Sequence, residues 1–316
     1  MTKSSVGVWS LIGNTPVLPL YFAESDQTIW VKCEFMNPSG SIKDRIAAYI
    51  IEDAERRGIL KPDSIIVECS SGNTGIAFAM VGVAKGYRVQ ILLSEGASFE
   101  RRWLIRQLGG EVVLFDSDGN YTTGINITRQ MAENDPRIFL PRQFENELNV
   151  EDHLTTTGQE ILKQVEGPIG LFVSGYGTGG TLAGVGKALK TANPNCKVWA
   201  MEPAEAAILD DEMPCCHRIE GVADGFMPDL MKYAPVDGHT KVSSNDALAM
   251  TKRLGREFGL LVGTSSGANV VAALRVAQEQ KVEGAIVTIL CDRAERYYST
   301  ALFRETACED KKANLS

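Results

Sequence analysis

Lys43 is the residue in this chain whose type and position best suit covalent chemistry. It follows a turn of Pro, Ser and Gly within Asn-Pro-Ser-Gly-Ser-Ile-Lys-Asp-Arg (residues 37–45), and a helix capped by Ser41 is expected to carry it and to run to about Arg57. The positive end of a helix disfavours the charged form of lysine, which suits an amine that must act as an uncharged nucleophile. Taken alone, a lysine is more often a solvated surface residue.

Three loops rich in Gly, Ser and Thr each follow a predicted strand and lead into a predicted helix, the place where open α/β sheets bind ligands. The first, Ser70-Ser71-Gly72-Asn73-Thr74-Gly75, offers hydroxyls and free backbone N–H groups that suit a carboxylate. The second, Gly175-Tyr176-Gly177-Thr178-Gly179-Gly180-Thr181, suits a phosphate because its glycines allow close approach and its N–H groups form an anion nest. The third, Gly263-Thr264-Ser265-Ser266-Gly267, is a hydroxyl-rich loop that opens a helix.

These loops and Lys43 together indicate one ligand. Taken singly, a loop of this kind is more often a helix cap than a ligand site. The second loop does not end in the Gly-Lys-Ser/Thr of a Walker motif, and it lacks the spacing and the later acidic residue of a Rossmann fingerprint. A phosphate site, a carboxylate site and a nucleophilic amine in one chain predict pyridoxal phosphate bound through a lysine.

Short apolar strands alternate with helices along most of the chain, a pattern that predicts an α/β protein with parallel sheets covered on both faces. An irregular loop near residues 135–150 is the expected boundary between an N-terminal domain (1–146) and a C-terminal domain (147–316). Residues 203–243 are expected to be irregular. The expected strands are 17–20, 29–35, 65–68, 88–93, 111–115, 169–174, 197–202 and 285–290, and the expected helices are 43–57, 73–85, 99–108, 122–133, 151–165, 180–191, 245–258 and 267–280.

Composition limits the class of protein. A net charge of −8 argues against nucleic acid as the main partner, because phosphate binding needs a basic face. No apolar run approaches the length of a membrane helix and residues 1–5 do not open a secretion signal, so a cytoplasmic protein without membrane contact is expected. Its seven cysteines are expected to be reduced. Cys215, Cys216 and His217 lack the usual spacing of metal ligands, and no metal site is expected.

The ordered motifs resemble the fold-type II pyridoxal-phosphate enzymes of the cysteine synthase and cystathionine β-synthase family, and most of all the O-acetylserine sulfhydrylases. The resemblance implies a tryptophan synthase β-like fold: two three-layer αβα domains with mostly parallel sheets and the cofactor in the cleft between them. The smaller N-terminal domain would be mobile, residues 1–35 would pack on the larger domain, and the enzyme would be a homodimer. The matching motifs cover residues 12–16, 37–45, 71–75, 100–102, 143–144, 156–158, 177–181, 265–267 and 295–300.

The resemblance also assigns roles to individual residues. Lys43 would bind the cofactor through its amine and carry a proton at Cα, Asn73 would hydrogen-bond the phenolic oxygen, and Ser265 would face the pyridine nitrogen. A hydroxyl at that nitrogen leaves the ring largely neutral, which favours loss of a β-leaving group over transamination. The cofactor phosphate would lie on Gly177, Thr178, Gly179, Gly180 and Thr181, and the substrate carboxylate on Ser70, Ser71, Asn73, Thr74 and Gln143.

The implied reaction is a β-replacement on an activated amino acid, O-acetyl-L-serine or O-phospho-L-serine, which passes through an aminoacrylate and forms L-cysteine with sulfide. The alternative is β-elimination or β-replacement on L-cysteine with release of hydrogen sulfide. A non-catalytic sensor or scaffold is the competing class, and the intact Lys43 argues against it.

The chain departs from the family pattern near the predicted site. Cys69 and Ser70 stand where proline and threonine are usual, and Gly96 and Ala97 replace bulkier residues, which would open the cleft to a larger acceptor. Asp224 stands where synthases often have a small residue. It is either a solvated turn aspartate, a common use of this residue, or a base near Cβ that deprotonates an incoming thiol, amine or water.

Overall fold

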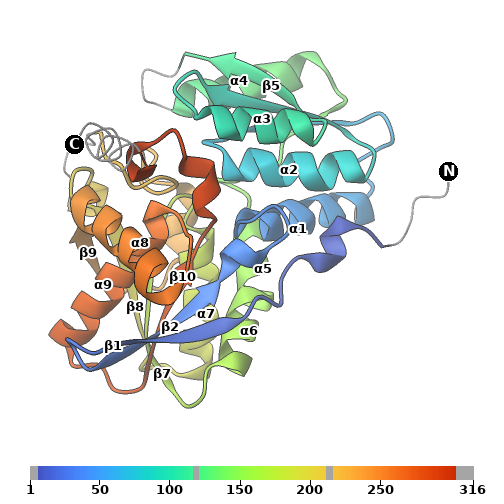
Figure 1. The fold of residues 1–316 in the computed structure, drawn as a ribbon. Helices are drawn as coiled ribbons and strands as arrows, with labels where there is room; N and C mark the ends of the chain where they lie inside the picture. Colours follow the sequence, from blue (N-terminus) through green and yellow to red (C-terminus); the bar gives the residue numbers. More distant parts are fainter. Residues whose placement is uncertain (1–5, 117–120, 211–215, 304–316) are drawn as a thin grey trace, which may run out of the picture.

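A computed structural model describes residues 6–116, 121–210 and 216–303, and two sheets organise them (Figure 1). All pairs of described strands are parallel except β1 with β2. The six-stranded sheet has the order β1 (Val17–Phe22), β2 (Gln27–Cys33), β10 (Ala285–Leu290), β7 (Ile169–Gly175), β8 (Lys197–Pro203) and β9 (Gly238–Val242). The four-stranded sheet has the order β5 (Glu111–Phe115), β4 (Arg88–Ser94), β3 (Ile65–Cys69) and β6 (Ile138–Phe139).

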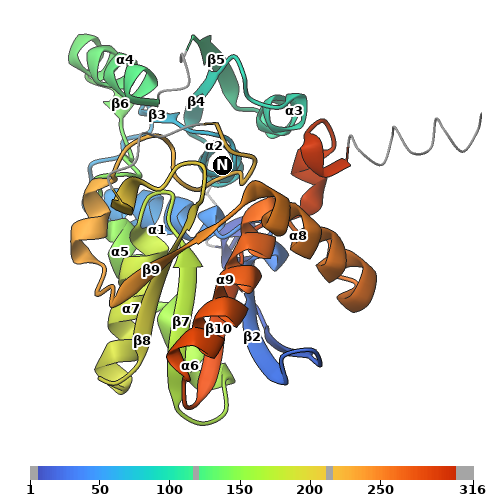
Figure 2. The ribbon, with the colours of Figure 1, turned by 90° about the vertical axis from the view of Figure 1, so that its left-hand side faces the viewer.

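Helices cover both faces of each sheet (Figures 1 and 2). On the four-stranded sheet, α4 packs on one face and α1, α2 and α3 lie on the other. On the six-stranded sheet, α6 and α7 pack on one face and α8 and α9 on the other. Their bounds are α1 (Lys43–Arg56), α2 (Asn73–Ala84), α3 (Phe99–Gln107), α4 (Tyr121–Asn134), α5 (Leu148–Thr155), α6 (Thr157–Gln164), α7 (Gly180–Ala192), α8 (Ser244–Phe258) and α9 (Thr264–Gln280), with short 3-10 helices η1 (Val8–Leu11), η2 (Glu34–Met36), η3 (Ile208–Asp210), η4 (Asp229–Tyr233) and η5 (Ala294–Tyr297).

The prediction of two αβα units with mostly parallel sheets is confirmed. Continuous apolar strands explain this layered arrangement, because a strand such as β3, which is buried at every residue, needs cover on both faces of its sheet. β1 and β2 precede Lys43 in the chain and yet belong to the six-stranded sheet. The domain boundary at residue 146 and the mobility of the smaller domain stay predictions. None of the described helices is both long and apolar enough to cross a membrane.

Several elements differ from the sequence-based expectation, and one of them is β6, which lies in the loop expected near residues 135–150. The helix expected over 151–165 is two helices that meet at Thr156, whose hydroxyl donates to the carbonyl of Asp152 over 2.7 Å, and a threonine bonded to the preceding turn bends a helix. β9 lies in a stretch expected to be irregular, since Gly-His-Thr-Lys-Val has no apolar run to indicate a strand. α9 begins at Thr264, so Ser265 lies inside the first turn of the helix and not in a loop before it.

Candidate active site

A cavity lies at the carboxyl ends of β3, β7 and β10, where the loops of the two sheets face each other. This is the place where ligands bind in open α/β sheets. The cavity brings together residues from all three predicted loops and the lysine. The predicted site residues that line it are Lys43, Ser71, Asn73, Thr74, Gln143, Gly177, Thr178, Gly179, Thr181, Asp224 and Ser265.

Two predicted site residues, Ser70 and Gly180, do not line this cavity. Ser70 is fully buried, and its hydroxyl oxygen accepts hydrogen bonds from the backbone N–H groups of Gly72 (2.9 Å) and Gly75 (3.1 Å). It therefore shapes the loop that carries Ser71 and Asn73. Gly180 begins α7, and a Cβ at this position would lie 2.0 Å from Asn149 Oδ1, so the helix start requires glycine.

α1 begins at Lys43, and the residue in the capping position is Ile42, not Ser41. Ser41 still contributes, because its hydroxyl oxygen accepts the backbone N–H of Lys43 over 3.3 Å. Burial lowers the pKa of the Lys43 amine, while nearby groups that can carry negative charge, Asp224 among them, raise it. The lowered pKa agrees with the predicted direction of the shift, and burial is its largest cause.

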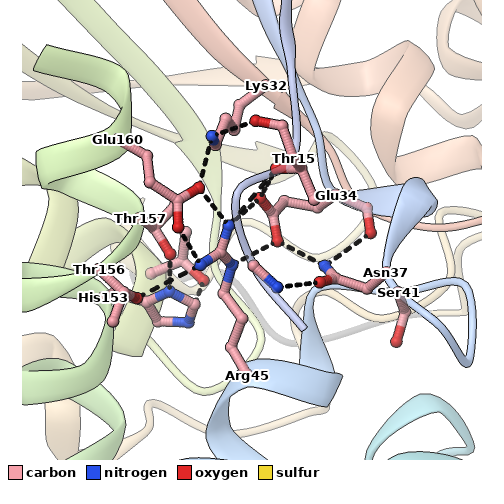
Figure 3. Close-up of polar contacts among 12 residues, drawn as sticks. Thr15, Lys32, Glu34, Asn37, Ser41, Arg45, His153, Thr156, Thr157 and Glu160 are labelled. Carbon is pink, nitrogen blue, oxygen red and sulfur yellow. Dashed lines mark hydrogen bonds and ion pairs between the residues drawn. The ribbon is translucent and has the colours of Figure 1, made fainter. Parts of the chain in front are cut away.

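Arg45 fixes the start of α1 in the protein (Figure 3). Its guanidinium pairs with Glu34 (Nε to Oε2, 2.7 Å) and with Glu160 (Nη2 to Oε2, 2.7 Å). Lys32 Nζ lies 2.6 Å from the same Glu160 carboxylate. Two cations and two carboxylates balance one another in this buried cluster, so no buried charge is left unpaired. Lys43, two residues before Arg45, therefore projects from a helix start that is tied to β2, η2 and α6.

Asn73 and Asp292 join the two halves of the site. Asn73 begins α2, and its Nδ2 donates to Asp292 Oδ2 over 2.6 Å. Asp292 follows β10 and also accepts the hydroxyl of Tyr297. Burial raises the pKa of Asp292. Asp292 was not among the predicted site residues, although it lies directly after the buried run Ala285–Leu290 and so has the same strand-end position that identified the other loops.

The loop of residues 70–75, here named the carboxylate loop for its predicted ligand, is braced from behind by a buried glutamate. Thr74 Oγ1 donates to Gln143 Oε1 over 2.6 Å, and Gln143 Nε2 donates to the carbonyl of Cys69 over 2.9 Å. Glu68 accepts the backbone N–H groups of Cys69 (2.9 Å) and Gln143 (3.2 Å). Burial raises the pKa of Glu68 to about 8. Gln143 and the loop after β3 therefore form one hydrogen-bonded unit.

The loop between β7 and α7 has the backbone of an anion site. Gly179 has a φ of 85°, in the left-handed region that favours glycine. A Cβ at Gly177 would lie 2.6 Å from the carbonyl oxygen of Gly221 on the facing wall. These glycines let backbone N–H groups at the start of α7 face the cavity without a side chain in the way, which is how helix N-termini hold phosphate.

Two side chains behind this loop hold its hydroxyl groups. Asn149 Nδ2 donates to Thr178 Oγ1 over 3.0 Å, and Thr181 Oγ1 lies 3.2 Å from His153 Nε2. His153 Nδ1 lies 2.8 Å from Thr157 Oγ1 (Figure 3). Burial lowers the pKa of His153 to about 3, so its ring is neutral and orients Thr181 without adding charge.

Asp224 and Ser265 complete the cavity wall. Asp224 is half-buried; burial raises its pKa and the charge of Lys43 opposes that rise. Ser265 is buried, and its hydroxyl interacts with the thiol of Cys291, whose pKa burial raises to about 12. Gly96 and Ala97 do not line the cavity.

The lining fits pyridoxal phosphate, the cofactor that the resemblance implies. A half-buried amine, a glycine backbone that tolerates no side chain at Gly177, and a helix N-terminus are what a carbonyl group and a phosphate require. Asn73 Oδ1 is buried without a partner among the described residues, so one polar atom of the lining is left for a ligand.

Of the three neighbouring residues Cys215, Cys216 and His217, Cys215 lies outside the described residues.

Known proteins resemble this chain in sequence and in structure. The family model of the pyridoxal-phosphate dependent enzymes matches residues 8–292. A cysteine synthase of Staphylococcus aureus (strain Mu50) is 42% identical over 299 residues, which are 94% of this chain and 96% of that protein. The crystal structure of a hydrogen sulfide-producing enzyme from Fusobacterium nucleatum, 39% identical, superposes with a TM-score of 0.89 over 93% of this chain and 90% of its own. The crystal structure of an O-ureido-L-serine synthase, 40% identical, superposes with a TM-score of 0.89 over 94% of each chain.

Proposed function

This chain belongs to the family of pyridoxal-phosphate dependent enzymes, and from that premise we propose that it catalyses β-replacement on an activated L-serine, O-acetyl-L-serine first and O-phospho-L-serine second, to form L-cysteine with sulfide. The observation that carries the proposal is the cavity, which brings together the half-buried Lys43, the glycine-rich loop of residues 177–181 and the loop of residues 70–75. The identity to a cysteine synthase over nearly the full length of both chains supports the choice of reaction.

Pyridoxal phosphate, when bound, draws electrons away from Cα of an amino acid, which makes loss of a group on Cβ possible. In this proposal Lys43 holds the cofactor through its amine and afterwards moves the proton at Cα. Its lowered pKa supports both tasks, because only the uncharged amine can attack a carbonyl or accept a proton. Asn73 holds the phenolic oxygen, Ser265 meets the pyridine nitrogen as a neutral hydroxyl, and the loop of residues 177–181 holds the phosphate.

The substrate carboxylate is assigned to the loop after β3. Ser71, Asn73 and Thr74 line the cavity beside the N-terminus of α2, where backbone N–H groups and the helix dipole favour an anion. Gln143, held by Thr74, faces the same space. Ser70 contributes through the shape of the loop. Closure of this loop on the substrate would exclude water from the reacting atoms.

A second candidate function is favoured by Asp224. A carboxylate with a raised pKa in the cavity wall can accept a proton from an incoming thiol, amine or water. Such a base would suit an enzyme that takes L-cysteine as donor and releases hydrogen sulfide. One structural neighbour is named as a hydrogen sulfide-producing enzyme, which agrees with this alternative.

The deciding experiment is a visible absorbance spectrum of the holoenzyme before and after O-acetyl-L-serine is added without an acceptor. We expect a cofactor band that shifts to a lasting new band and returns when sulfide is added and cysteine forms. A band that does not move with O-acetyl-L-serine but moves with O-phospho-L-serine or L-cysteine would name that donor instead. Lys43→Ala is the control and should not turn over, since it lacks the amine that carries the proton. A wild-type preparation that binds no cofactor would contradict the proposal.

Small amino acids are the proposed partners, and we propose a cytoplasmic homodimer that binds neither nucleic acid nor membrane. Large apolar side chains that a monomer leaves in water support self-association, among them Leu11 (70% exposed), Trp103 (65%) and Phe99 (61%). The mass in solution, measured by light scattering, tests this assembly.

A further inference from the structure

We propose that Glu202, Asp210 and His239 form a binding site for a divalent transition-metal ion outside the catalytic cavity. One ligand atom from each of these residues lies within 4.8 Å of the other two. Two carboxylates and one imidazole form a ligand set that Mn²⁺, Fe²⁺ and Zn²⁺ accept, whereas Mg²⁺ and Ca²⁺ prefer oxygen ligands alone. The site goes beyond the proposed reaction, which uses none of these three residues.

The fold brings the three ligands together from β8, η3 and β9. The parallel register pairs Ala200 with His239, so Glu202, two residues further along β8, lies on the same face as His239. Asp210 ends η3, and the backbone N–H of the preceding residue, Leu209, donates to Glu202 Oε2 over 3.1 Å. Glu202 thus holds in place the segment that supplies the second carboxylate.

One oxygen of Glu202 has no hydrogen-bond partner among the described residues. The side chain is fully buried; Oε2 accepts the hydroxyl of Tyr176 over 2.9 Å, while Oε1 is unpaired. Oε1 lies 4.0 Å from His239 Nε2, which is too long for a hydrogen bond, and that Nε2 lies 2.7 Å from Asp210 Oδ1. A buried carboxylate oxygen without a partner is costly, so the geometry calls for a cation there.

The distances suit an ion held by all three ligands. Metal–ligand bonds of about 2.0–2.2 Å place two ligand atoms at most about 4.4 Å apart. The 2.7 Å and 4.0 Å separations at His239 Nε2 lie within that limit. The carboxylates of Glu202 and Asp210 lie within 4.8 Å of each other, so a small adjustment of the exposed Asp210 side chain brings all three ligands within reach of one ion. Metal binding requires that the His239 proton lie on Nδ1, which leaves the Nε2 lone pair for the ion.

The charge around the site favours a dication, but one ammonium group competes with the ion for Asp210. Lys241 Nζ lies 2.9 Å from Asp210 Oδ2 and neutralises part of the charge of that carboxylate. Two carboxylates, a neutral imidazole and one ammonium leave a net charge of −1. Oδ1 of Asp210 is hydrogen-bonded to His239 Nε2, and an ion would take the place of the proton that these two atoms share.

The site is one hydrogen bond away from the catalytic cavity. Tyr176, which donates to Glu202, lines the cavity in the loop after β7. Its carbonyl accepts the backbone N–H of Ala223 over 3.0 Å, directly before Asp224. An ion on Glu202 would therefore steady the wall that carries Asp224.

The test is titration of the holoenzyme with Mn²⁺, with the free ion followed by its electron paramagnetic resonance signal, and a parallel titration with Mg²⁺. We expect one saturable Mn²⁺ site per chain and much weaker binding of Mg²⁺. His239→Gln and Asp210→Asn change side chains that are 34% and 33% exposed, so the fold should tolerate both, and each should weaken Mn²⁺ binding at least about 100-fold. Asp135→Asn is the matched control, because it removes the same charge from an aspartate of similar exposure (28%) that is paired with Arg137.

A gain of affinity provides an outcome that misfolding cannot imitate. Lys241→Met removes the competing ammonium and should bind Mn²⁺ several-fold more tightly than the parent enzyme. Absence of a saturable site in the parent, or His239→Gln and Asp210→Asn variants that bind as the parent does, would overturn the proposal. Weaker binding by Lys241→Met would also count against it.

Discussion

Asp224 is the side chain whose protonation should control the second half of the reaction. A base works only when ionised, and a raised pKa means that Asp224 gains its proton at a higher pH than an ordinary aspartate does. We therefore expect kcat/KM for the acceptor to fall as the pH is lowered through that pKa. In Asp224→Asn the acidic limb should be absent and acceptor turnover should drop roughly 100-fold, while the absorbance change on adding the donor is retained.

The control for this change is Asp229→Asn, which removes the same charge from an exposed aspartate five residues further along the chain that does not line the cavity. Steady-state rates over a range of pH, with sulfide, a larger thiol and water compared as acceptors, provide the measurement. If Asp224→Asn keeps its turnover, its pH profile and its acceptor preference, then Asp224 is only a wall residue.

Residues with a local motif could be predicted from the sequence, and residues defined by distant contacts could not. Lys43 and the loop at 177–181 are surrounded by turn and cap residues that reveal their position. Ser70 had the right type, but its hydroxyl is used by the backbone of its own loop. Glu202 and His239 meet only through the register of β8 and β9, which no spacing in the chain shows.

At the scale of elements, the buried cluster around Arg45 should determine how firmly α1 is held. Arg45→Met leaves Glu34, which is fully buried, without its main partner, and we expect unfolding to become easier by about 3–5 kcal/mol. Urea denaturation of the holoenzyme measures this change. Arg253→Met is the control: Arg253 also pairs with two glutamates, but at the surface, and its loss should hardly move the midpoint. Equal shifts for both variants would contradict the structural role of the Arg45 cluster.

The limits of element prediction have two physical causes in this chain. Apolar runs identified the strands that are covered on both faces, but β9 pairs with β8 alone among the described strands and is mostly half-buried, so its sequence is polar. The break between α5 and α6 depends on a hydrogen bond of one threonine side chain, and the apolar spacing of residues 151–165 continues through it. Both elements border the proposed sites, so the misplaced boundaries matter for function.

At the scale of the whole molecule, the two halves meet across the cavity through Arg101 and Glu220. Arg101, on α3, packs so closely on the carboxylate loop that a Cβ at Gly72 would lie 2.2 Å from its Cδ. Its Nη2 lies 2.9 Å from Glu220 Oε2, in the segment that leads to Asp224. This ion pair therefore links the loop that should bind the substrate carboxylate to the opposite wall.

We expect Glu220→Gln to weaken the contact between the two halves and to raise KM for the donor about three- to tenfold, because a charge-assisted hydrogen bond at a partly exposed site is lost. The urea midpoint should fall only slightly, because the amide oxygen that replaces the carboxylate can still accept a hydrogen bond from the buried Arg101. Glu111→Gln, which removes a carboxylate paired with Arg88 away from the cavity, should leave KM unchanged. A Glu220→Gln enzyme with unchanged KM would show that the two halves close without this pair, and the carboxylate loop would then be expected to close on the substrate alone.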